Sequence, residues 1–482
     1  MHFSVICKIL GMLLMVFSSA MWVPIITALI EGDGTQRGFF LALGITFFSG
    51  LALWLPVRNA HHELRIRDGF LITSLFWTVL GLFGALPFLL STDLDLTPTE
   101  AIFESISGLT TTGATVIVGL DDLPSSLLLY RQLLQWLGGI GIIVVAVAIL
   151  PMLGIGGMQL YKAETPGPSK DTKLTPRITE TAKALTQVYV ALTVACAVAY
   201  YFAGMSAFDA VAHSFSTVAI GGFSTHDASM GYFESDAVLL VCTLFMVISA
   251  INFGLHYTAW RRLSIVPYRK DSETNFFFGI LLVGISVTVF YLFITETLSG
   301  SDSVVHGLFQ AVSLTTTTGF ATQDYALWPS FLPIMLLMFS SMGGCVGSTG
   351  GGIKAMRVML IYKQGLRELK QLVHPNAVIP LKVGRRRVEA SVVSAVWSFF
   401  AVYASAYLLI MLALMATGLD FTTAFSAVAA AINNLGPGLG EVAANYSSIN
   451  EVAKGLLCFT MLLGRLEIFT LLVIFTPAFW RL

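Results

Sequence analysis

Four short loops, each built around one glycine, recur along this chain at intervals of about 100 residues. They read TTTGAT from Thr110, AIGGFST from Ala219, TTTGFAT from Thr316 and NNLGPG from Asn433. Their pivotal glycines are Gly113, Gly222, Gly319 and Gly436. Each loop follows an apolar run, and so long a period predicts one structural unit repeated four times. Four such loops can surround a single axis.

Composition sets the environment of these units. Of the 482 residues, 56% are hydrophobic and 11% are charged, with a mean hydropathy of +0.80, whereas a soluble domain carries about 25% charged residues. We therefore expect an all-α, multi-pass membrane protein. The five cysteines form no CxxC pair and are expected to be packing residues, without a disulfide framework or a zinc site. The apolar run from Lys8 to about Ile30 is too long for a signal peptide and predicts a retained first span.

Apolar segments long enough to cross a bilayer occur ten times in the sequence. They lie near 4–30, 37–57, 69–91, 126–154, 183–204, 235–260, 275–298, 328–362, 390–417 and 452–479. A shorter apolar run that ends in a glycine loop lies between spans three and four, five and six, seven and eight, and nine and ten. These runs are too short to span and are predicted to be re-entrant half-helices. They cover 98–109, 207–218, 303–315 and 421–432.

The half-helices carry start signals in the sequence. Residues 97–100 read TPTE, which is a capping box with proline at the first helical position. Ser206 repeats that spacing, with Asp209 in place of the glutamate. Asp302 or Ser303 is expected to cap the third half-helix, and the aspartate at 420 is expected to cap the fourth.

The repeated unit is therefore span, half-helix, loop, span. The predicted fold has four pseudo-symmetric units around a central pore, with two extra N-terminal spans outside the repeat. The expected boundaries are 1–66 for the two N-terminal spans, and 67–162, 163–270, 271–372 and 373–482 for the four units.

Lysine and arginine are distributed unevenly between the two sets of loops. Basic residues gather at Arg65, Arg67, Lys162, Lys170, Lys173, Arg177, Arg261, Arg262, Arg269, Lys270, Lys363, Arg367, Lys370, Lys382, Arg385, Arg386 and Arg387. The glycine-loop side instead carries Asp121, Asp122, Asp227, Glu234, Asp324 and Glu441. The positive-inside rule places the basic side in the cytoplasm and the glycine loops outside, where an acidic vestibule attracts cations.

The glycine loops have the residue types that a dehydrated cation requires. A potassium-selective pore replaces the water around the ion with backbone carbonyls, and glycine and threonine permit the backbone to present them. The predicted ion-binding residues are Thr110, Thr111, Thr112, Gly113, Ala219, Ile220, Gly221, Gly222, Thr316, Thr317, Thr318, Gly319, Asn433, Asn434, Leu435 and Gly436. The second and fourth loops match through the glycine alone, so we expect unequal sides and looser selectivity. The alternative is that these loops are ordinary turns between spans.

The eighth predicted span is interrupted by a segment with six glycines in ten positions. Because each glycine costs a helix about 1 kcal/mol relative to alanine, this segment is predicted to be an intramembrane loop on the cytoplasmic side of the filter. The predicted gating residues are Gly343, Gly344, Gly347, Ser348, Thr349, Gly350, Gly351 and Gly352. One alternative is close helix packing through small residues. A weaker alternative is a phosphate-binding loop, for which the Gly-Lys-Ser/Thr order is missing.

Arg465 stands in the otherwise apolar last span, where a charge is costly and usually faces a pore or a partner. It is predicted to act in gating, as a positive barrier below the filter or as a tether for the glycine-rich loop. The alternative is a structural ion pair. Glu467 is not the expected partner, because residues two apart on a helix do not face each other. The equivalent positions in the other units are Gly139, Asn252 and Gly344, so one side of the pore would carry the charge.

Three polar residues, Glu104, His213 and Gln310, each lie nine residues before a pivotal glycine. We expect them to brace the half-helices through hydrogen bonds. The basic clusters around Arg261 and Arg385 either follow from membrane topology or dock a regulator, and the sequence does not separate these two interpretations.

Together these motifs resemble the TrkH branch of the Trk/Ktr/HKT superfamily, the membrane subunits of bacterial Trk potassium-uptake systems. The resemblance covers the whole chain, with the four glycine loops, Gly343–Gly352 and the run Leu463-Gly464-Arg465-Leu466-Glu467 as its specific motifs. It implies an intramembrane gating loop and a homodimer with one pore per protomer. It also implies a cytosolic ring of TrkA-type nucleotide-binding subunits with RCK domains, and a place in the bacterial inner membrane.

The expected function is potassium uptake across the lipid bilayer by a channel or transporter that is not an enzyme. Potassium is the expected transported ion, and neither an organic cofactor nor a nucleic acid is expected to bind. One rival is a proton- or sodium-coupled symporter, with Glu104, Glu467 and His213 as its candidate intramembrane carriers. A second rival is a non-conducting receptor or scaffold for a cytosolic nucleotide-binding protein.

Overall fold

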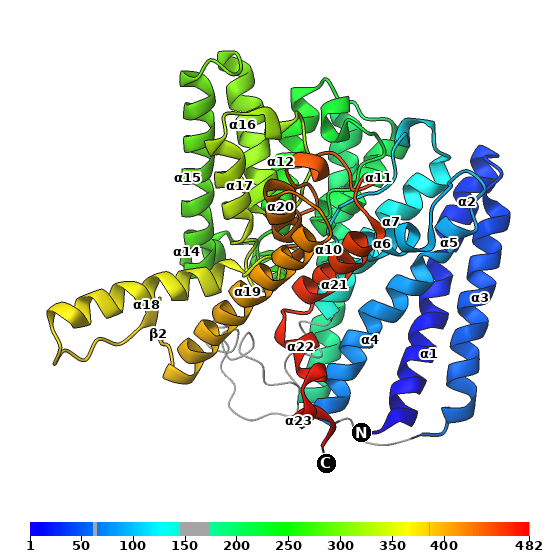
Figure 1. Ribbon diagram of the computed structural model, residues 1–482, viewed down its shortest axis with the longest axis horizontal. Coiled ribbons are helices and arrows are strands. Elements are labelled where there is room, and N and C mark those ends of the chain that lie inside the picture. The colour runs from blue at the N-terminus through cyan, green and yellow to red at the C-terminus, as the bar shows by residue number, and fades with distance from the viewer. Residues whose placement is uncertain (61–64, 145–173, 385, 482) are drawn as a thin grey trace.

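The computed structural model describes residues 1–60, 65–144, 174–384 and 386–481. Helices dominate it (Figure 1), and the strands of the described residues form one short antiparallel hairpin of β1 (Lys382–Val383) and β2 (Arg386–Arg387). The predicted all-α class is confirmed. Several predictions fall outside the described residues: the fourth span beyond 144, the boundary at 162/163, the basic residues Lys162, Lys170, Lys173 and Arg385, and the side chain of Arg177.

The two N-terminal spans form an antiparallel pair at one side of the molecule (Figure 1, blue). They consist of α1 (Phe3–Ala20) with α2 (Trp22–Glu31), and of α3 (Gln36–Trp54). A Cβ added to Gly11 would lie 2.6 Å from the carbonyl oxygen of Gly50, and one added to Gly50 would lie 2.7 Å from that of Gly11. This glycine pair lets the two backbones meet directly. Helix α2 also packs against α7 and so attaches the pair to the first unit.

Four units of span, half-helix, loop and span follow. The first contains α4 (Ile66–Gly84), α5 (Leu86–Leu89), α6 (Pro98–Leu109) and α7 (Ser125–Val144). The second contains α10 (Leu174–Ala203), α11 (Ala207–Ala219), α12 (Asp236–Ser249), α13 (Phe253–Arg262) and α14 (Val266–Lys270). The third contains α15 (Ser272–Ile294), α16 (Gly300–Thr315), α17 (Phe331–Ser340) and α18 (Ala355–Val373). The fourth contains α19 (Ala390–Ala416), α20 (Phe421–Ile432), α21 (Glu451–Arg465), α22 (Phe469–Leu472) and α23 (Pro477–Trp480).

Six of the described helical segments are long and apolar enough to cross a membrane, and two bent pairs raise that number to eight. The bends measure 96° between α12 and α13 and 109° between α21 and the segment Phe469–Phe475. The two remaining predicted spans are not among these segments. The fourth is described as the helix α7 as far as residue 144, and the eighth is broken into α17 and α18 by the glycine-rich segment.

The starts of the half-helices agree with three of the four predicted caps. The side chains of Thr97, Ser206 and Asp420 each accept a hydrogen bond from a backbone N–H in the first turn. The third prediction was wrong. Helix α16 begins earlier than expected, and its cap is Ser299, whose side chain accepts from the backbone N–H of Asp302. This serine and aspartate have the spacing of the second half-helix, so the signal was present in the sequence.

The four half-helices are arranged as a ring. Helix α6 packs against α21 of the fourth unit, α11 against α7 of the first, α16 against α12 of the second, and α20 against α17 of the third. Each half-helix also packs against the span that precedes it in its own unit. Contacts therefore pass from unit to unit and return to the start, so the half-helices surround one axis.

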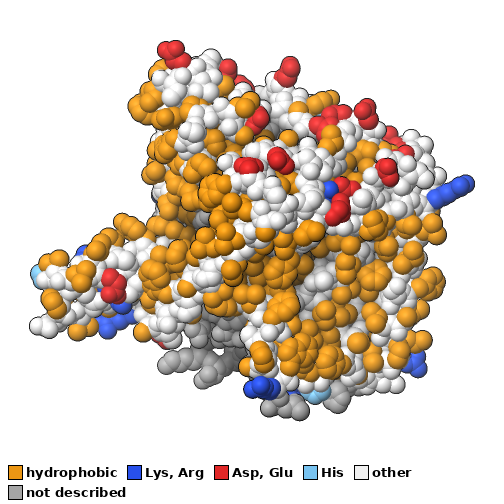
Figure 2. Space-filling model, in the orientation of Figure 1, with side chains coloured by type: hydrophobic (Ala, Val, Ile, Leu, Met, Phe, Trp, Pro, Cys, Tyr) orange, Lys and Arg blue, Asp and Glu red, His pale blue; other side chains and the backbone are white. Residues whose placement is uncertain are grey.

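Charge separates along the direction of the spans. In Figure 2, acidic side chains gather at the upper end, a broad hydrophobic band crosses the middle, and most of the visible lysine and arginine lies toward the lower edge. Short 3₁₀ turns follow the glycine loops in the chain, at Leu120–Asp122, Ser229–Tyr232, Tyr325–Leu327 and Gly440–Val442. This distribution of charge agrees with the predicted orientation, in which the basic face is cytoplasmic.

Candidate functional site

The four glycine loops share one backbone conformation, although their sequences differ. In each loop, the pivotal glycine and the residue two before it have positive φ. The φ angles are 53° and 83° at Thr111 and Gly113, 55° and 81° at Ile220 and Gly222, 66° and 84° at Thr317 and Gly319, and 53° and 101° at Asn434 and Gly436. A positive φ at a non-glycine residue costs about 1–3 kcal/mol and persists only where the surroundings impose it. Its recurrence in all four copies distinguishes these loops from ordinary turns.

The same hydrogen bond closes each half-helix onto its loop. The backbone N–H of the residue just before the pivotal glycine donates to the carbonyl oxygen five residues earlier, and the N···O distance is 2.8 Å in every copy. The donor and acceptor pairs are Thr112 and Ser107, Gly221 and Ser216, Thr318 and Ser313, and Leu435 and Ala430. Because only backbone atoms take part, the second and fourth loops can adopt the geometry of the first and third without sharing their threonines.

Each pivotal glycine faces a carbonyl oxygen of the next loop. A Cβ added to Gly113 would lie 2.1 Å from the carbonyl oxygen of Gly221, and one added to Gly222 would lie 2.1 Å from that of Thr318. A Cβ added to Gly319 would lie 1.9 Å from the carbonyl oxygen of Leu435, and one added to Gly436 would lie 2.7 Å from that of Thr112. Every one of these distances is shorter than a real Cβ contact, so any other residue at these four positions would force the neighbouring loop to shift. The contacts run from the first loop to the second, third and fourth and back to the first. The loops therefore form a closed ring.

A cavity of 630 Å³ lies on the outer side of this ring, and all four pivotal glycines line it. Of the six acidic residues predicted to form an outer vestibule, Asp227 and Asp324 line this cavity, and the other four are not among its lining residues. The carboxylate of Asp227 also accepts from the backbone N–H groups of Gly119, at 3.1 Å, and Leu120, at 2.9 Å. It therefore joins the outer loops of the first and second units while it contributes negative charge at the entrance.

The side-chain contacts differ around the ring, in line with the prediction of unequal sides. Gln135 donates through Nε2 to the carbonyl of Gly221, at 2.6 Å, and accepts through Oε1 from the N–H of Phe223, at 3.1 Å. The amide of Asn434 in the fourth loop donates to the Thr112 hydroxyl of the first, at 3.0 Å. Each of these contacts occurs at one side of the ring, because Gln135 and Asn434 have no glutamine or asparagine at the equivalent positions of the other units.

Glu104 braces the first half-helix through a buried ion pair. Its Oε1 accepts from Nε of Arg131, at 2.8 Å, and both side chains are almost fully buried. Arg131 also donates to the carbonyl of Ser224, at 2.9 Å, and its guanidinium lies over the ring of Phe223, 4.3 Å from the centroid. The pair therefore connects α6, α7 and the loop that follows α11. Breaking a buried pair on one side costs about 3–5 kcal/mol, because the other charge is left without compensation.

The bracing prediction holds for His213 and fails for Gln310. His213 lies in α11, and its Nε2 is 2.9 Å from the hydroxyl oxygen of Ser224. The side-chain amide atoms of Gln310 are buried without a hydrogen-bond partner among the described residues. Equal spacing from the pivotal glycines therefore does not give these polar residues equal surroundings.

The glycine-rich loop Gly343–Gly352 lies against the inner side of the ring, between α17 and α18. The Thr349 hydroxyl donates to the carbonyl of Val218 at the end of α11, at 3.0 Å. The N–H of Gly351 donates to the Thr317 hydroxyl, at 2.9 Å, and a Cβ added to Gly351 would lie 2.0 Å from the carbonyl oxygen of Asn433. The loop thus contacts the second, third and fourth units where their half-helices end. It is not a helix, so close helix packing through its glycines is not observed.

A carboxylate and an ammonium hold this loop in place. Oε1 of the buried Glu273, on α15, accepts from the backbone N–H groups of Val346, at 2.7 Å, and Met356, at 3.1 Å. Nζ of Lys354 donates to the carbonyl of Gly350, at 2.6 Å. Charge-assisted hydrogen bonds of this kind are about twice as strong as neutral ones. The loop is therefore held by charge-assisted hydrogen bonds at Val346 and at Gly350.

Arg465 binds two carbonyl oxygens from different units. It donates to Thr349 in the glycine-rich loop, at 3.1 Å, and to Gly138 in α7, at 3.0 Å. Glu467 is not the partner of Arg465, as the two-residue spacing predicted, and it pairs instead with Arg357 of α18. The ion-pair alternative for Arg465 is not observed among the described residues. Its two hydrogen bonds connect α21 to α7 and to the glycine-rich loop.

Sequence reasoning missed Lys354 and four further residues of this site. Arg131 was detectable, because a charge within an apolar span obeys the same rule that identified Arg465. Glu273 lies in the first turn of α15, where an acidic residue is common because it stabilises the helix N-terminus. Its sequence position therefore gave no sign that it also contacts the distant glycine-rich loop. The other two are Gln135 and Tyr446, whose hydroxyl donates to the carbonyl of Gly436, at 2.7 Å. Neither has a spacing or motif that marks it.

A helical multi-pass chain whose four half-helices converge on a ring of glycine loops has the fold of a membrane cation-transport protein. A model of the TrkH family, described as cation transport protein, matches residues 36–482, and the chain belongs to that family. It is a multi-pass protein of the bacterial inner membrane.

Known relatives match over their full length. The Trk system potassium uptake protein TrkH of Halomonas elongata is 54% identical over 481 residues, and its Escherichia coli K12 counterpart is 53% identical over 482, with 100% of each chain covered. The crystal structure of the potassium transporter TrkH from Vibrio parahaemolyticus has 52% identity and a TM-score of 0.94, over 100% of both chains. The resemblance inferred from the sequence and the fold class are confirmed.

Proposed function

We propose that this chain takes up potassium across the bacterial inner membrane and that the ring of glycine loops is its selectivity filter. The ring itself carries the proposal. Four loops have the same positive-φ pattern, and each pivotal glycine abuts a carbonyl of the next loop. A closed ring of backbone oxygens can replace the hydration shell of a potassium ion. The names of the relatives, which are potassium uptake proteins, support the same function.

The electrostatics of the site favour a cation. The C-terminal end of each half-helix carries a partial charge of about −0.5, and four such ends converge on the axis. Arg131 also lines the outer cavity, but Glu104 neutralises it. The negative charges of Asp227 and Asp324 therefore dominate the entrance.

The glycine-rich loop, with Arg465, is proposed to close the pathway below the filter. Its contacts with Val218, Thr317 and Asn433 place it against the inner side of the ring. Backbone without helical structure is tolerated at membrane depth where it is buried in protein or lines a water-filled path. Opening would then require release of the clasp at Glu273 and of the Arg465 tether.

The proposed assembly is a homodimer on which a cytosolic ring of TrkA-type nucleotide-binding subunits acts. Helix α18 projects from the body of the molecule (Figure 1) and exposes Leu369 by 61%, Leu372 by 79% and Val373 by 72%. Exposed apolar surface of this kind is typical of protein contacts. The relatives are named as parts of a Trk system, which supports a further component on the basic, cytoplasmic face.

A coupled symporter is less well supported. Of its candidate carriers, Glu104 is paired with Arg131 and Glu467 with Arg357, so neither carboxylate is free to exchange protons without loss of an ion pair. The purified chain alone, reconstituted in liposomes, tests the proposal through rubidium uptake and reversal potentials. Uptake with a reversal potential that follows potassium alone is expected. A reversal potential that shifts with the pH or sodium gradient would indicate symport, and absence of flux would favour a scaffold.

A further inference from the structure

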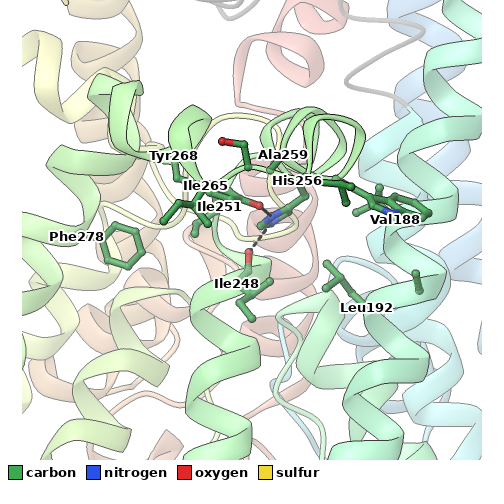
Figure 3. Close-up of a pocket in the computed structure, with 13 residues that line it drawn as sticks. Val188, Leu192, Ile248, Ile251, His256, Ala259, Ile265, Tyr268 and Phe278 are labelled. Carbon is green, nitrogen blue, oxygen red and sulfur yellow. Dashed lines mark hydrogen bonds between the residues drawn. The ribbon is translucent and has the colours of Figure 1, made fainter.

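An apolar groove of 730 Å³ lies on the basic side of the molecule, bordered by α10, α12, α13, α14 and α15 (Figure 3). In Figure 3, Val188 and Leu192 of α10 face Phe278 of α15 across it, with His256 of α13 between them. The volume is within the range of about 300–1,000 Å³ that is usual for sites of small organic ligands.

The imidazole that borders the groove has partners at both nitrogens. Nε2 of His256 is 2.9 Å from the Ile248 carbonyl oxygen, to which it donates, and Nδ1 therefore accepts from the Tyr268 hydroxyl, at 2.8 Å (Figure 3). A polar group without a partner would make hydrocarbon an unfavourable occupant. Because His256 is satisfied internally, the groove favours an apolar ligand.

The chain turns by 96° between α12 and α13, so α13 runs almost perpendicular to α12 and ends at the basic pair Arg261 and Arg262. The turn from α13 to α14 exposes large apolar side chains: Trp260 by 58%, Leu263 by 90% and Ile265 by 62%. A segment in the membrane plane that exposes both aromatic and basic residues is typical of contact with lipid headgroups and the upper part of acyl chains.

Four basic residues directly follow residues that line the groove: Arg261 and Arg262 follow Trp260, and Arg269 and Lys270 follow Tyr268. Arg261, Arg262, Arg269 and Lys270 are exposed, and the ion pairs of the described residues involve none of them. The lining residues of the groove include no aspartate or glutamate. Uncompensated basic groups beside an apolar groove at the cytoplasmic leaflet are complementary to an anionic lipid.

We propose that this groove binds an anionic phospholipid of the cytoplasmic leaflet, with an acyl chain between α10 and α15 and the phosphate against Arg261 and Arg262. An acidic protein would be attracted by the same arginines, but it would leave the apolar groove unexplained. The site adjoins the glycine-rich loop, because the N–H of Phe253 donates to the Gly347 carbonyl, at 3.0 Å. A bound lipid would therefore brace the bend to which the loop is attached.

Lipid binding can be measured on the purified full chain in detergent by native mass spectrometry. The probes are phosphatidylglycerol and phosphatidylcholine with identical acyl chains. The wild-type protein is expected to bind phosphatidylglycerol in preference. Arg261→Ala with Arg262→Ala is expected to weaken that binding about tenfold or more, and Ala191→Trp, which fills the groove, is expected to weaken binding of both lipids.

Two matched control variants test whether lipid binding depends on the positive charge at residues 261 and 262 or only on the total positive charge of the cytoplasmic loops. Arg261→Lys with Arg262→Lys keeps the charge, and Arg386→Ala with Arg387→Ala removes the same charge from another basic loop; both are expected to retain the preference. Equal binding of the two lipids by the wild-type protein, or unchanged binding by the alanine pair at 261 and 262, would overturn the proposal. The proposal would also be overturned if the variant Arg261→Ala with Arg262→Ala still bound phosphatidylglycerol but no longer bound an acidic protein partner. Gel filtration excludes variants that do not fold.

Discussion

The carboxylate of Glu273 accepts a hydrogen bond from the backbone N–H of Val346, 2.7 Å away, and so joins the first span of the third unit to the glycine-rich loop. The same oxygen accepts from the N–H of Met356, just beyond the other end of the loop. One buried side chain therefore connects a residue within the loop to the first turn of α18. The loop is held by a residue that lies far from it in the sequence.

Glu273→Ala is expected to raise the basal rubidium flux of the chain reconstituted alone. Each hydrogen bond to a charged group contributes about 1.5–3 kcal/mol, so loss of both should release the loop in a substantial fraction of molecules. Glu273→Gln keeps an acceptor oxygen without the charge and should have a smaller effect. Flux of the alanine variant equal to wild type would show that the clasp does not hold the pathway closed.

Gly113→Ser is expected to lower the selectivity for potassium over sodium. Its new Cβ would meet the Gly221 carbonyl and displace the second loop from the first. Gly119→Ser is the matched control, because Gly119 also has a positive φ, of 80°, but has open space around it. Permeability ratios from reversal potentials are the measurement. If the two serine variants have the same ratio, the ring is not the filter.

Substitution of Arg465 distinguishes a charge barrier from a tether. Arg465→Lys keeps the positive charge but cannot reach the carbonyls of Thr349 and Gly138 together in the geometry of a planar guanidinium. A tether therefore predicts increased flux for both Arg465→Lys and Arg465→Ala, whereas a barrier predicts increased flux for the alanine variant alone. Single-channel or liposome flux measurements decide between them. Wild-type flux in both variants would exclude both roles.

The outer loops of the first and second units are joined by His226, which pairs with Asp121 and lies 3.4 Å from a carboxylate oxygen of Asp209. Its ring stacks on Tyr232, with the centroids 3.4 Å apart. Burial lowers the pKa of His226, but the carboxylates of Asp209 and Asp121 outweigh burial and raise the pKa above its ordinary value of 6.5. The stabilisation from this histidine is therefore complete below pH 6.5 and is lost as the pH rises through the raised pKa.

The thermal midpoint of the wild-type protein should accordingly fall as the pH is raised above 6.5, and His226→Gln should remove that part of the dependence. The measurement is the difference in midpoint between the two proteins, by intrinsic fluorescence, over the pH range in which the bilayer-mimicking detergent is stable. Asp122→Asn, next to the pairing aspartate, is the control and should retain the wild-type slope. A difference that does not vary with pH would contradict the assignment.

The sequence allowed the repeat, the half-helices and the intramembrane loop to be predicted, because each depends on local pattern. The second and fourth loops were recognised by Gly222 and Gly436 alone, and this was sufficient because the shared geometry uses backbone hydrogen bonds. Ser299 was overlooked as a cap because the start of the apolar run, rather than the serine-to-aspartate spacing, was used to place the helix.

The remaining parts of the site depend on contacts between distant segments. Gln135 reaches the second loop from the last span of the first unit, and Glu273 reaches the glycine-rich loop from α15. One sequence contains no information about which turn of a span faces which loop. The charge of Arg131 was visible, but its partner in α6 and its position beside the entrance required the folded arrangement.

The contact between Gly436 and the carbonyl of Thr112 joins the last unit to the first. Translation reaches the C-terminal unit last, so this contact can form only after the other three units have been synthesised. If the ring is the proposed filter, a chain that stops before the fourth unit has three of the four walls. Under that proposal, selective conduction has to wait until the fourth loop has been synthesised.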